Sequence, residues 1–473
     1  MDNRYKYLIK NTGILTISSF STKILTFLMV PLYTSVLTTE EYGTYDLAVS
    51  TVSLLIPILS VNIVDGVMRY SMDSRYDRAD IFSIGLRRIS VATFIFAAIL
   101  AFNSIFQITS VFAEKELLIL LYFISTLLYS LLTQFAKGCE AVKQMAIAGI
   151  ISTICLVGTN ILLLLVFKLG VTGFFIASCA SQLIPAIYLA ARLKIWNYTH
   201  LKINKQVQAE VLKYSAPLVL TAVSWWINSA SDKYVVSFLI GVSANGILSV
   251  AYKIPTILNT IQQLFLQAWQ ISAVKEYNAD SKAFYQETFQ ILDALMSFLA
   301  LGLILTTRIL AHILYAKDFF VAWKYVPFLI ISSVINTASG YLGAILSAKK
   351  DSKIMGESAV ISAIANTVMN IVFVKLFGVQ GATIATALSS FLIFAIRASH
   401  TQDVLPKKSI FTSFFVWLML CVTAWLYVYS KHYILILIPM VAVLMCYRKV
   451  YYTLLYSAKR IIKRNKAGGL YEN

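Results

Sequence analysis

Residues 231–259, SDKYVVSFLIGVSANGILSVAYKIPTILN, place three charged side chains inside segments that are otherwise hydrophobic enough to cross a membrane. Asp232 and Lys233 lie at the start of this stretch, and Lys253 lies near its end. A charge at the centre of a membrane-spanning helix costs roughly 2.5 to 3.5 kcal/mol and normally faces a bundle interior or a watery cavity. We therefore expect the stretch to line a polar path through a bilayer.

The composition of the whole chain predicts the same class of protein. Of its 473 residues, 59% are hydrophobic and only 13% are charged, which is far outside the range of soluble domains. Because a span needs about 20 apolar residues, we predict an all-α polytopic membrane protein with about 14 transmembrane helices. The predicted spans are 12–37, 43–66, 88–111, 116–136, 145–167, 171–191, 214–239, 246–271, 286–307, 323–347, 356–376, 379–399, 409–430 and 432–450.

The distribution of basic residues predicts the topology. With both termini cytoplasmic, the cytoplasmic connections and ends hold thirty of the forty Lys and Arg, and the opposite connections hold seven. The remaining three, Lys23, Lys233 and Lys253, lie within spans. Since short cytoplasmic loops are enriched in Lys and Arg, the net charge of +18 is mainly a topology signal. Nucleic-acid binding is not expected.

An internal repeat suggests how the chain is organised. Residues 170–184, GVTGFFIASCASQLI, resemble residues 378–392, GVQGATIATALSSFL, and Asn245-Gly246 in the eighth span weakly echoes Tyr42-Gly43 in the second. Recurrence of small packing residues by chance is the alternative explanation. The predicted parts are an N-lobe over 1–193, an amphipathic interfacial linker over 194–213, a C-lobe over 214–402, two further helices over 403–452 and a basic cytoplasmic tail over 453–473.

Several predicted spans carry a polar stripe along one helical face. On a helix that advances about 100° per residue, the eighth span aligns Lys253 with a row of hydroxyl and amide side chains. Such a face is typical of a helix that lines a cavity, although amides and hydroxyls also bond neighbouring helices. The residues concerned are Thr256, Asn259, Gln263 and Gln267 in the eighth span, Thr16, Ser19 and Lys23 in the first, and Asn228 with Asp232 in the seventh.

Acidic residues within the spans have several interpretations. Lys233 lies about 100° from Asp232, so we expect the two to have different partners. Asp46 lies on a polar stripe of the second span, and Asp293 is isolated in the ninth, where it would pair with a lysine or carry a proton. Asp65 and Arg69, four residues apart, suggest a salt bridge at the membrane rim.

Catalytic motifs are missing from the sequence. It has no phosphate-binding loop of the G-x-x-x-x-G-K-[ST] type, no H-E-x-x-H metal motif, and no soluble segment long enough for a nucleotide-binding domain. We predict no enzymatic activity, no catalytic residue, no metal site and no cofactor. Transport driven by an ion or lipid gradient remains, with H+ or Na+ as the candidate coupling ion.

Two segments carry a resemblance to a known family. Residues 37–60, LTTEEYGTYDLAVSTVSLLIPILS, followed by DGVMRY at 65–70, resemble the N-terminal signature of the polysaccharide-exporting branch of the multidrug/oligosaccharidyl-lipid/polysaccharide (MOP) exporter superfamily. The opening stretch is similar to the D-K-Y and A-Y-K-I-P elements of spans 7 and 8 in that branch. With both G-V-x-G copies, the similarity covers about the first 400 residues.

The resemblance implies two six-helix lobes around a central cavity and a Wzx-type flippase. Such a protein moves undecaprenyl-diphosphate-linked oligosaccharide from the inner to the outer leaflet of the bacterial cytoplasmic membrane. The family's cationic cavity makes Lys23, Lys253 and Lys233 the candidate phosphate ligands, with Trp225, Trp226 and Trp269 as candidate sugar contacts. Asp232, Asp293 and Asp46 are the candidates for coupling.

Further expectations and rival functions follow from the same resemblance. A monomer is expected, with a polysaccharide polymerase and glycosyltransferases as candidate partners in the bilayer. The two extra helices resemble those of MurJ-type lipid II flippases, whose last two helices form a lipid groove, so lipid II is an alternative substrate. A drug or cation antiporter of the same superfamily is another rival, but its cavity should favour carboxylates over lysines. A non-transporting lipid scaffold is a rival of a different class, but it would not need lysines at mid-membrane.

Overall fold

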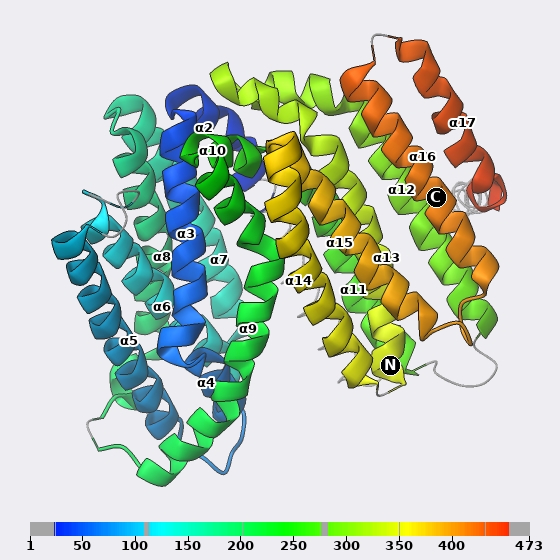
Figure 1. Cartoon of the computed structure of the whole chain (residues 1–473). Helices are drawn as coiled ribbons and strands as arrows, with labels where there is room; N and C mark the ends of the chain where they lie inside the picture. Colours follow the sequence, from blue (N-terminus) through cyan, green and yellow to red (C-terminus); the bar gives the residue numbers. More distant parts are fainter. Residues whose placement is uncertain are drawn as a thin grey trace, which may run out of the picture. The chain divides into compact units, whose positions relative to one another are not determined.

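The computed structural model describes residues 23, 25–107, 112, 114–200, 202–275, 282–349, 351–430 and 432–453. These residues form helices and contain no strand (Figure 1). The helices are α2 (Val30–Val36), α3 (Thr39–Ser60), α4 (Ile63–Ser71), α5 (Arg78–Phe106), α6 (Glu116–Gly138), α7 (Val142–Asn160), α8 (Gly170–Leu193), α9 (Lys205–Leu239), α10 (Val242–Ala251), α11 (Thr256–Lys275), α12 (Lys282–Leu314), α13 (Val326–Ala348), α14 (Ser352–Phe377), α15 (Val379–Ser399), α16 (Lys407–Tyr429) and α17 (Leu437–Cys446). Short helical turns occupy Ile161–Val166, Ile195–Tyr198, Lys317–Lys324 and Tyr433–Ile436.

The lengths and hydropathies of these helices fit a membrane protein. Within the described residues, ten helices are long and apolar enough to cross a bilayer, and three shorter apolar helices cover Leu25–Val36, Val242–Ala251 and Ile434–Cys446. Many large apolar side chains lie on their outer surfaces, as lipid contact requires, including Phe238 at 90% exposed. The predicted all-α polytopic membrane fold is therefore confirmed.

Contacts divide the chain into two compact units. Unit 1 comprises Met1–Val250 and Ile313–Phe320, and unit 2 comprises Ala251–His312 and Val321–Asn473. In unit 1, α8 packs against α6 and α7, and in unit 2, α13 packs against α11 and α15. The linker predicted over 194–213 lies inside unit 1, where it forms the turn Ile195–Tyr198 and the start of α9. The lobe boundaries inferred from the repeat stay a prediction.

The eighth predicted span is two helices rather than one. α10 ends at Ala251, α11 begins at Thr256, and the turn between them contains Lys253 and Pro255. A proline has no backbone N–H and clashes with the carbonyl four residues before it, so it interrupts a helix at this point. The predicted polar stripe is therefore split, because Ser249 belongs to unit 1 whereas Lys253 and the polar residues of α11 belong to unit 2.

The glycines of the internal repeat have matching structural roles. Gly170 and Gly378, the first glycine of each copy, have φ angles of +53° and +60°, a left-handed conformation that glycine adopts without steric cost. Gly173 and Gly381, the second glycines, pack against the segment that precedes their helix. At Gly381 a Cβ atom would overlap the carbonyl oxygen of Phe373 on α14. The G-V-x-G spacing thus has the same structural role in both units: the first glycine makes a turn, and the second allows its helix to pack closely against the preceding segment.

Replacing Gly381 with alanine should destabilise unit 2, because α15 must move away from the α14 backbone. We expect a loss of about 1–3 kcal/mol, typical of overpacking, measured as a lower unfolding temperature of the purified protein in detergent. Gly356→Ala is the matched control: a methyl group on this α14 glycine would have no neighbouring atom within 4 Å, and alanine there should stabilise the helix slightly. Equal unfolding temperatures for the two variants would contradict the proposed contact.

Candidate functional site

A charged cluster joins three helices of unit 1. The Lys233 ammonium of α9 lies 3.0 Å from the Asp46 carboxylate of α3, and the two side chains are 18% and 15% exposed. The second partner of Asp46 is Ser249 of α10, whose hydroxyl donates to the carboxylate at 2.7 Å. Asp46 thus holds α9 and α10 to α3 through one ion pair and one charge-assisted hydrogen bond from a hydroxyl.

Two glycines allow α3 and α10 to approach closely enough for this cluster. A Cβ atom at Gly43 would overlap the backbone of Val242, and one at Gly246 would overlap the backbone of Thr39. The side-chain amide of Asn245 also donates to the Gly43 carbonyl at 3.2 Å. Asp46 lies three residues after Gly43, and Ser249 lies three residues after Gly246. The weak sequence similarity around the two glycines therefore corresponds to the place where α3 crosses α10, and the residues at the matching positions, Asp46 and Ser249, are hydrogen-bonded to each other.

Asp232 and Lys233 have separate environments, although they are adjacent in the chain. Lys233 reaches Asp46 on α3, whereas the Asp232 carboxylate accepts the backbone N–H of Lys233 at 2.9 Å and is 4% exposed. A substrate contact and a coupling group were expected of Lys233 and Asp46, respectively. The structure instead brings these two residues into direct contact.

Sequence reasoning did not identify the hydrogen bonds that extend the α3–α9 contact. The Trp226 indole donates to the Ser50 carbonyl at 2.8 Å, and the Tyr234 hydroxyl bonds the Thr51 hydroxyl at 2.7 Å. Tyr234 is the tyrosine of the D-K-Y element, so the sequence motif pointed to this residue. It did not indicate that Thr51 would be its hydrogen-bond partner. Together with Asp46, these residues tie α3 to α9 over two helical turns.

The predicted cavity residues differ in exposure. Lys23 is exposed, and so are Asn228 on α9 and a row of polar side chains on α11, whereas Lys253 and Asn259 are half-buried. The exposed α11 residues are Thr256, Gln263 and Gln267. Thr16 and Ser19 lie outside the described residues. The opposite face of α11 is apolar and buried, as Leu258 and Trp269 show, so this helix does present a polar face away from the core of unit 2.

Trp269 does not have the exposed position that a sugar contact would need. It is 3% exposed, stacks on Tyr341 with ring centroids 4.2 Å apart, and donates to the Tyr341 carbonyl at 3.2 Å. Its indole therefore belongs to the core of unit 2. Trp225 differs, because it is 73% exposed on the same face of α9 as Asn228.

Asp293 is buried in unit 2 and bonded by neutral donors. The Trp417 indole of α16 donates to one carboxylate oxygen at 3.1 Å, and the Tyr447 hydroxyl donates to the other. Asp293 is 2% exposed. Of the two alternatives raised for this residue, pairing with a lysine does not occur among the described residues, which leaves it as a carboxyl group held by hydrogen bonds.

The rim salt bridge predicted between Asp65 and Arg69 does not form. Asp65 lies in the first turn of α4, where its carboxylate accepts from Asn62 at 2.7 Å and from Gln134 of α6 at 3.3 Å. A carboxylate is stabilised at a helix N-terminus, and these amide donors satisfy it there. Arg69 is exposed at the other end of the same short helix.

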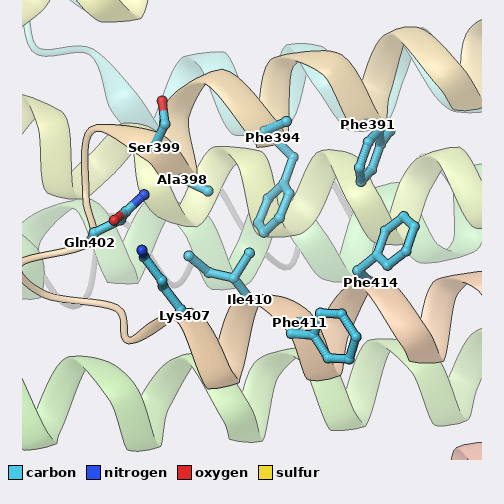
Figure 2. Close-up of a pocket in the computed structure, with 10 residues that line it drawn as sticks. Phe391, Phe394, Ala398, Ser399, Gln402, Lys407, Ile410, Phe411 and Phe414 are labelled. Atoms are coloured by element: carbon cyan, nitrogen blue, oxygen red, sulfur yellow. The ribbon is translucent and has the colours of Figure 1, made fainter.

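An apolar groove runs between α15 and α16 in unit 2 (Figure 2). Its volume is about 460 Å³, and its walls carry Phe391 and Phe394 from α15 and Phe411 and Phe414 from α16. The polar end of the groove is formed by Ser399, Gln402 and Lys407. A hydrocarbon chain with a polar end group would match this distribution.

Comparisons with known proteins agree with the geometry. Residues 8–270 match the model of a family described as polysaccharide biosynthesis protein. No curated protein sequence matches the chain. Among solved structures, the fold is similar to that of a lipid II flippase MurJ in an inward closed conformation, with a TM-score of 0.68 at 16% identity over 94% of this chain and 99% of that chain. It is also similar to an inward-facing structure of a multidrug resistance MATE family transporter of the MOP superfamily, with a TM-score of 0.62 at 14% identity over 82% of this chain and 98% of that chain. An outward-facing structure of such a transporter has a TM-score of 0.54 at 14% identity, over 83% of this chain and 96% of that chain.

The pairing of Asp46 with Lys233 can be tested by a double-mutant cycle. Asp46→Asn or Lys233→Gln alone should destabilise the protein by about 1–3 kcal/mol, because each leaves one charge in a poorly hydrated place. The double variant should recover most of this loss, as measured by unfolding in detergent. The pair Lys353 and Glu357 on α14, whose side chains are 81% and 51% exposed, provides the control cycle, for which we expect little change. Additive losses from Asp46 and Lys233 would show that the two charges do not stabilise each other.

Proposed function

The chain belongs to the polysaccharide biosynthesis protein family, and from this premise we propose that it is a flippase for undecaprenyl-diphosphate-linked oligosaccharide repeat units. The proposed direction is from the cytoplasmic to the outer leaflet of a bacterial cytoplasmic membrane, by alternating access. Both termini would be cytoplasmic, as the distribution of Lys and Arg predicts. The fold supports this proposal, since it is shared with membrane transporters.

The observation that carries the proposal is the position of Lys253 at the start of α11. This helix has 20 residues and no acidic side chain in its first turn, so the positive end of its dipole adds to the lysine charge. Thr256, Gln263 and Gln267 continue from that point as an exposed polar face. A cationic helix start followed by amides and a hydroxyl suits a phosphate that carries sugars.

The candidate ligands therefore have different proposed roles. In unit 2, Lys253 would neutralise the diphosphate and the α11 amides would bond sugar hydroxyls. In unit 1, Lys23 stays a candidate phosphate ligand, and Asn228 and Trp225 stay candidate sugar contacts. Lys233 is already paired with Asp46, so its ammonium group would help to neutralise the diphosphate only if that ion pair opens. Part of the isoprenoid tail would lie along the phenylalanines of the α15–α16 groove.

The membrane potential supplies a driving force for this direction. Moving a negative charge outward from an inside-negative cell gains about 2.3 kcal/mol per charge per 100 mV. A resetting step would require a group that exchanges a cation, and Asp293 is the strongest of the three acidic candidates. Asp46 is held in an ion pair, and Asp232 accepts a backbone N–H, whereas Asp293 is bonded by neutral Trp417 and Tyr447.

Replacement of Lys253 tests the proposed function directly. In vesicles containing the purified protein and a fluorescent undecaprenyl-diphosphate-oligosaccharide, an impermeant quencher measures how much of the lipid reaches the other leaflet. Lys253→Ala should slow this movement at least about tenfold, the loss of one charge-assisted hydrogen bond of about 1.5–3 kcal/mol, while Lys253→Arg should retain substantial activity. The control is Lys353→Ala, a lysine on α14 that is 81% exposed.

The same vesicles separate the rival functions. Wild-type rates with the oligosaccharide-linked lipid should exceed those with lipid II, and a cationic drug should not be accumulated. Faster movement of lipid II would favour the MurJ-type alternative, and drug uptake would favour an antiporter. No movement of either lipid by a correctly folded wild-type protein would refute the flippase assignment.

A titrating role for Asp293 predicts that Asp293→Asn abolishes the response of transport to a pH gradient. The asparagine oxygen can still accept one hydrogen bond from Trp417 or Tyr447, so the variant should fold, but the side chain can no longer exchange a proton. The measurement compares flipping rates with and without a pH gradient across the vesicle membrane. Glu357→Gln, at a side chain that is 51% exposed on α14, serves as the control. An unchanged gradient response in Asp293→Asn would exclude Asp293 as the proton carrier.

A further inference from the structure

A second pocket lies in unit 2, apart from the polar face of α11. Its volume is about 500 Å³, and residues of α12, α16 and the chain from Met445 onward line it. Lys408, Arg448 and Lys449 are exposed residues of its lining. Among the described residues that line the pocket, none is a carboxylate, and no ion pair within the described part of the chain involves these three cations. The pocket therefore carries a concentrated positive charge.

The start of α16 adds to this positive charge. Lys407 and Lys408 occupy the first turn of a 23-residue helix, with no acidic residue in that turn and no side-chain cap from Pro406. Basic residues at a helix N-terminus are unfavourable, because the helix dipole is positive there. An anion bound in the pocket would remove this repulsion, and the pocket offers it three cationic side chains as well as the dipole.

The inner wall of the pocket is polar and held in place by hydrogen bonds. Gln290 of α12 donates to the Ser409 hydroxyl at 3.3 Å, and Gln286 donates to the Val404 carbonyl at 3.1 Å. Tyr447 also lines the pocket, and its hydroxyl donates to the buried Asp293. The wall is thus fixed before any ligand binds, which lowers the entropic cost of binding.

The surroundings of the pocket favour a lipid over a soluble anion. Met445 belongs to the lining and is 58% exposed, and the apolar side chains of α17 that precede it, Ile438 and Val441, are 70% and 47% exposed. A headgroup in the pocket would therefore place its acyl chains over an exposed apolar helix face. Basic pockets between membrane helices on the cytoplasmic side are suited to anionic lipid headgroups, and the Lys and Arg distribution predicts that this end of α16 is cytoplasmic.

From these observations we infer that the pocket formed by α12, α16 and the end of α17 binds the phosphate headgroup of an anionic membrane phospholipid. Lys408, Arg448 and Lys449 contact the phosphate, and the acyl chains lie against α17. This site does not depend on the proposed transport of a lipid-linked oligosaccharide, because membrane phospholipid is its ligand and binding needs no turnover.

Native mass spectrometry of the full-length protein in uncharged detergent tests the site, with phosphatidylglycerol as the probe and phosphatidylcholine as the reference lipid. The wild-type protein should bind its first phosphatidylglycerol more tightly than phosphatidylcholine. The triple variant Lys408→Gln, Arg448→Gln and Lys449→Gln should lose on the order of a hundredfold in affinity for phosphatidylglycerol, if each basic residue contributes as in other juxtamembrane sites. Thr412→Phe should also weaken binding, because it fills the pocket without changing its charge.

A second triple variant, Lys143→Gln, Arg192→Gln and Lys205→Gln, removes the same number and kind of charges from exposed positions outside the pocket. It should bind phosphatidylglycerol as the wild type does. Equal losses in the two triple variants, or wild-type affinity in Thr412→Phe, would mean that surface charge alone attracts the lipid and would overturn the site. Displacement of phosphatidylglycerol by inorganic phosphate at an equal concentration would show a site for soluble phosphate and overturn the lipid assignment.

Discussion

The packing of α3 against α9 in unit 1 depends on the requirement that a poorly hydrated charge be balanced. Asp46 and Lys233 lie on α3 and α9, far apart in the chain, and each would be costly in a bilayer alone. Bringing them together offsets that cost only if α3 and α9 pack at the correct height and rotation. The ion pair is therefore satisfied only by this packing of α3 on α9, and in some proteins such buried ionic groups contribute to structural specificity.

A close approach of the α3 and α10 backbones allows α10 to bond the Asp46 carboxylate as well. Ser249 can reach the Asp46 carboxylate because Gly43 and Gly246 have no side chains where α3 meets α10. In membranes, where lipid is as apolar as the helix surfaces, such contacts depend on packing and hydrogen bonds rather than on hydrophobic burial. The glycines and the Asp46 cluster are thus parts of one arrangement, in which small residues bring the polar groups within bonding distance.

The sequence predicted the helical class and the polar face of α11, because apolar length and helical periodicity are local properties. Pairings were harder to predict, since they depend on which helices become neighbours. Asp46 and Lys233 were both identified, but their contact requires the packing of α3 on α9. The failure of the Asp65–Arg69 pair has the same origin, because Gln134 on α6 and Asn62 compete for the carboxylate. The sequence likewise could not show that Trp269 is buried and Trp225 exposed, because the burial of Trp269 depends on its packing against Tyr341 of another helix.

Pro255 changes the interpretation of Lys253, the residue on which the proposed function most depends. A lysine in the middle of a continuous span would face the full cost of a charge at the helix centre. The break between α10 and α11 instead places it in a turn, where the Thr256 hydroxyl bonds its carbonyl. Non-helical backbone at membrane depth is tolerated where protein or a water-filled cavity surrounds it, and the same break creates a new helix N-terminus beside the lysine. The proline therefore places the positive end of α11 beside Lys253, and because a lysine beside a helix N-terminus is unfavourable by itself, a bound anion would stabilise both charges.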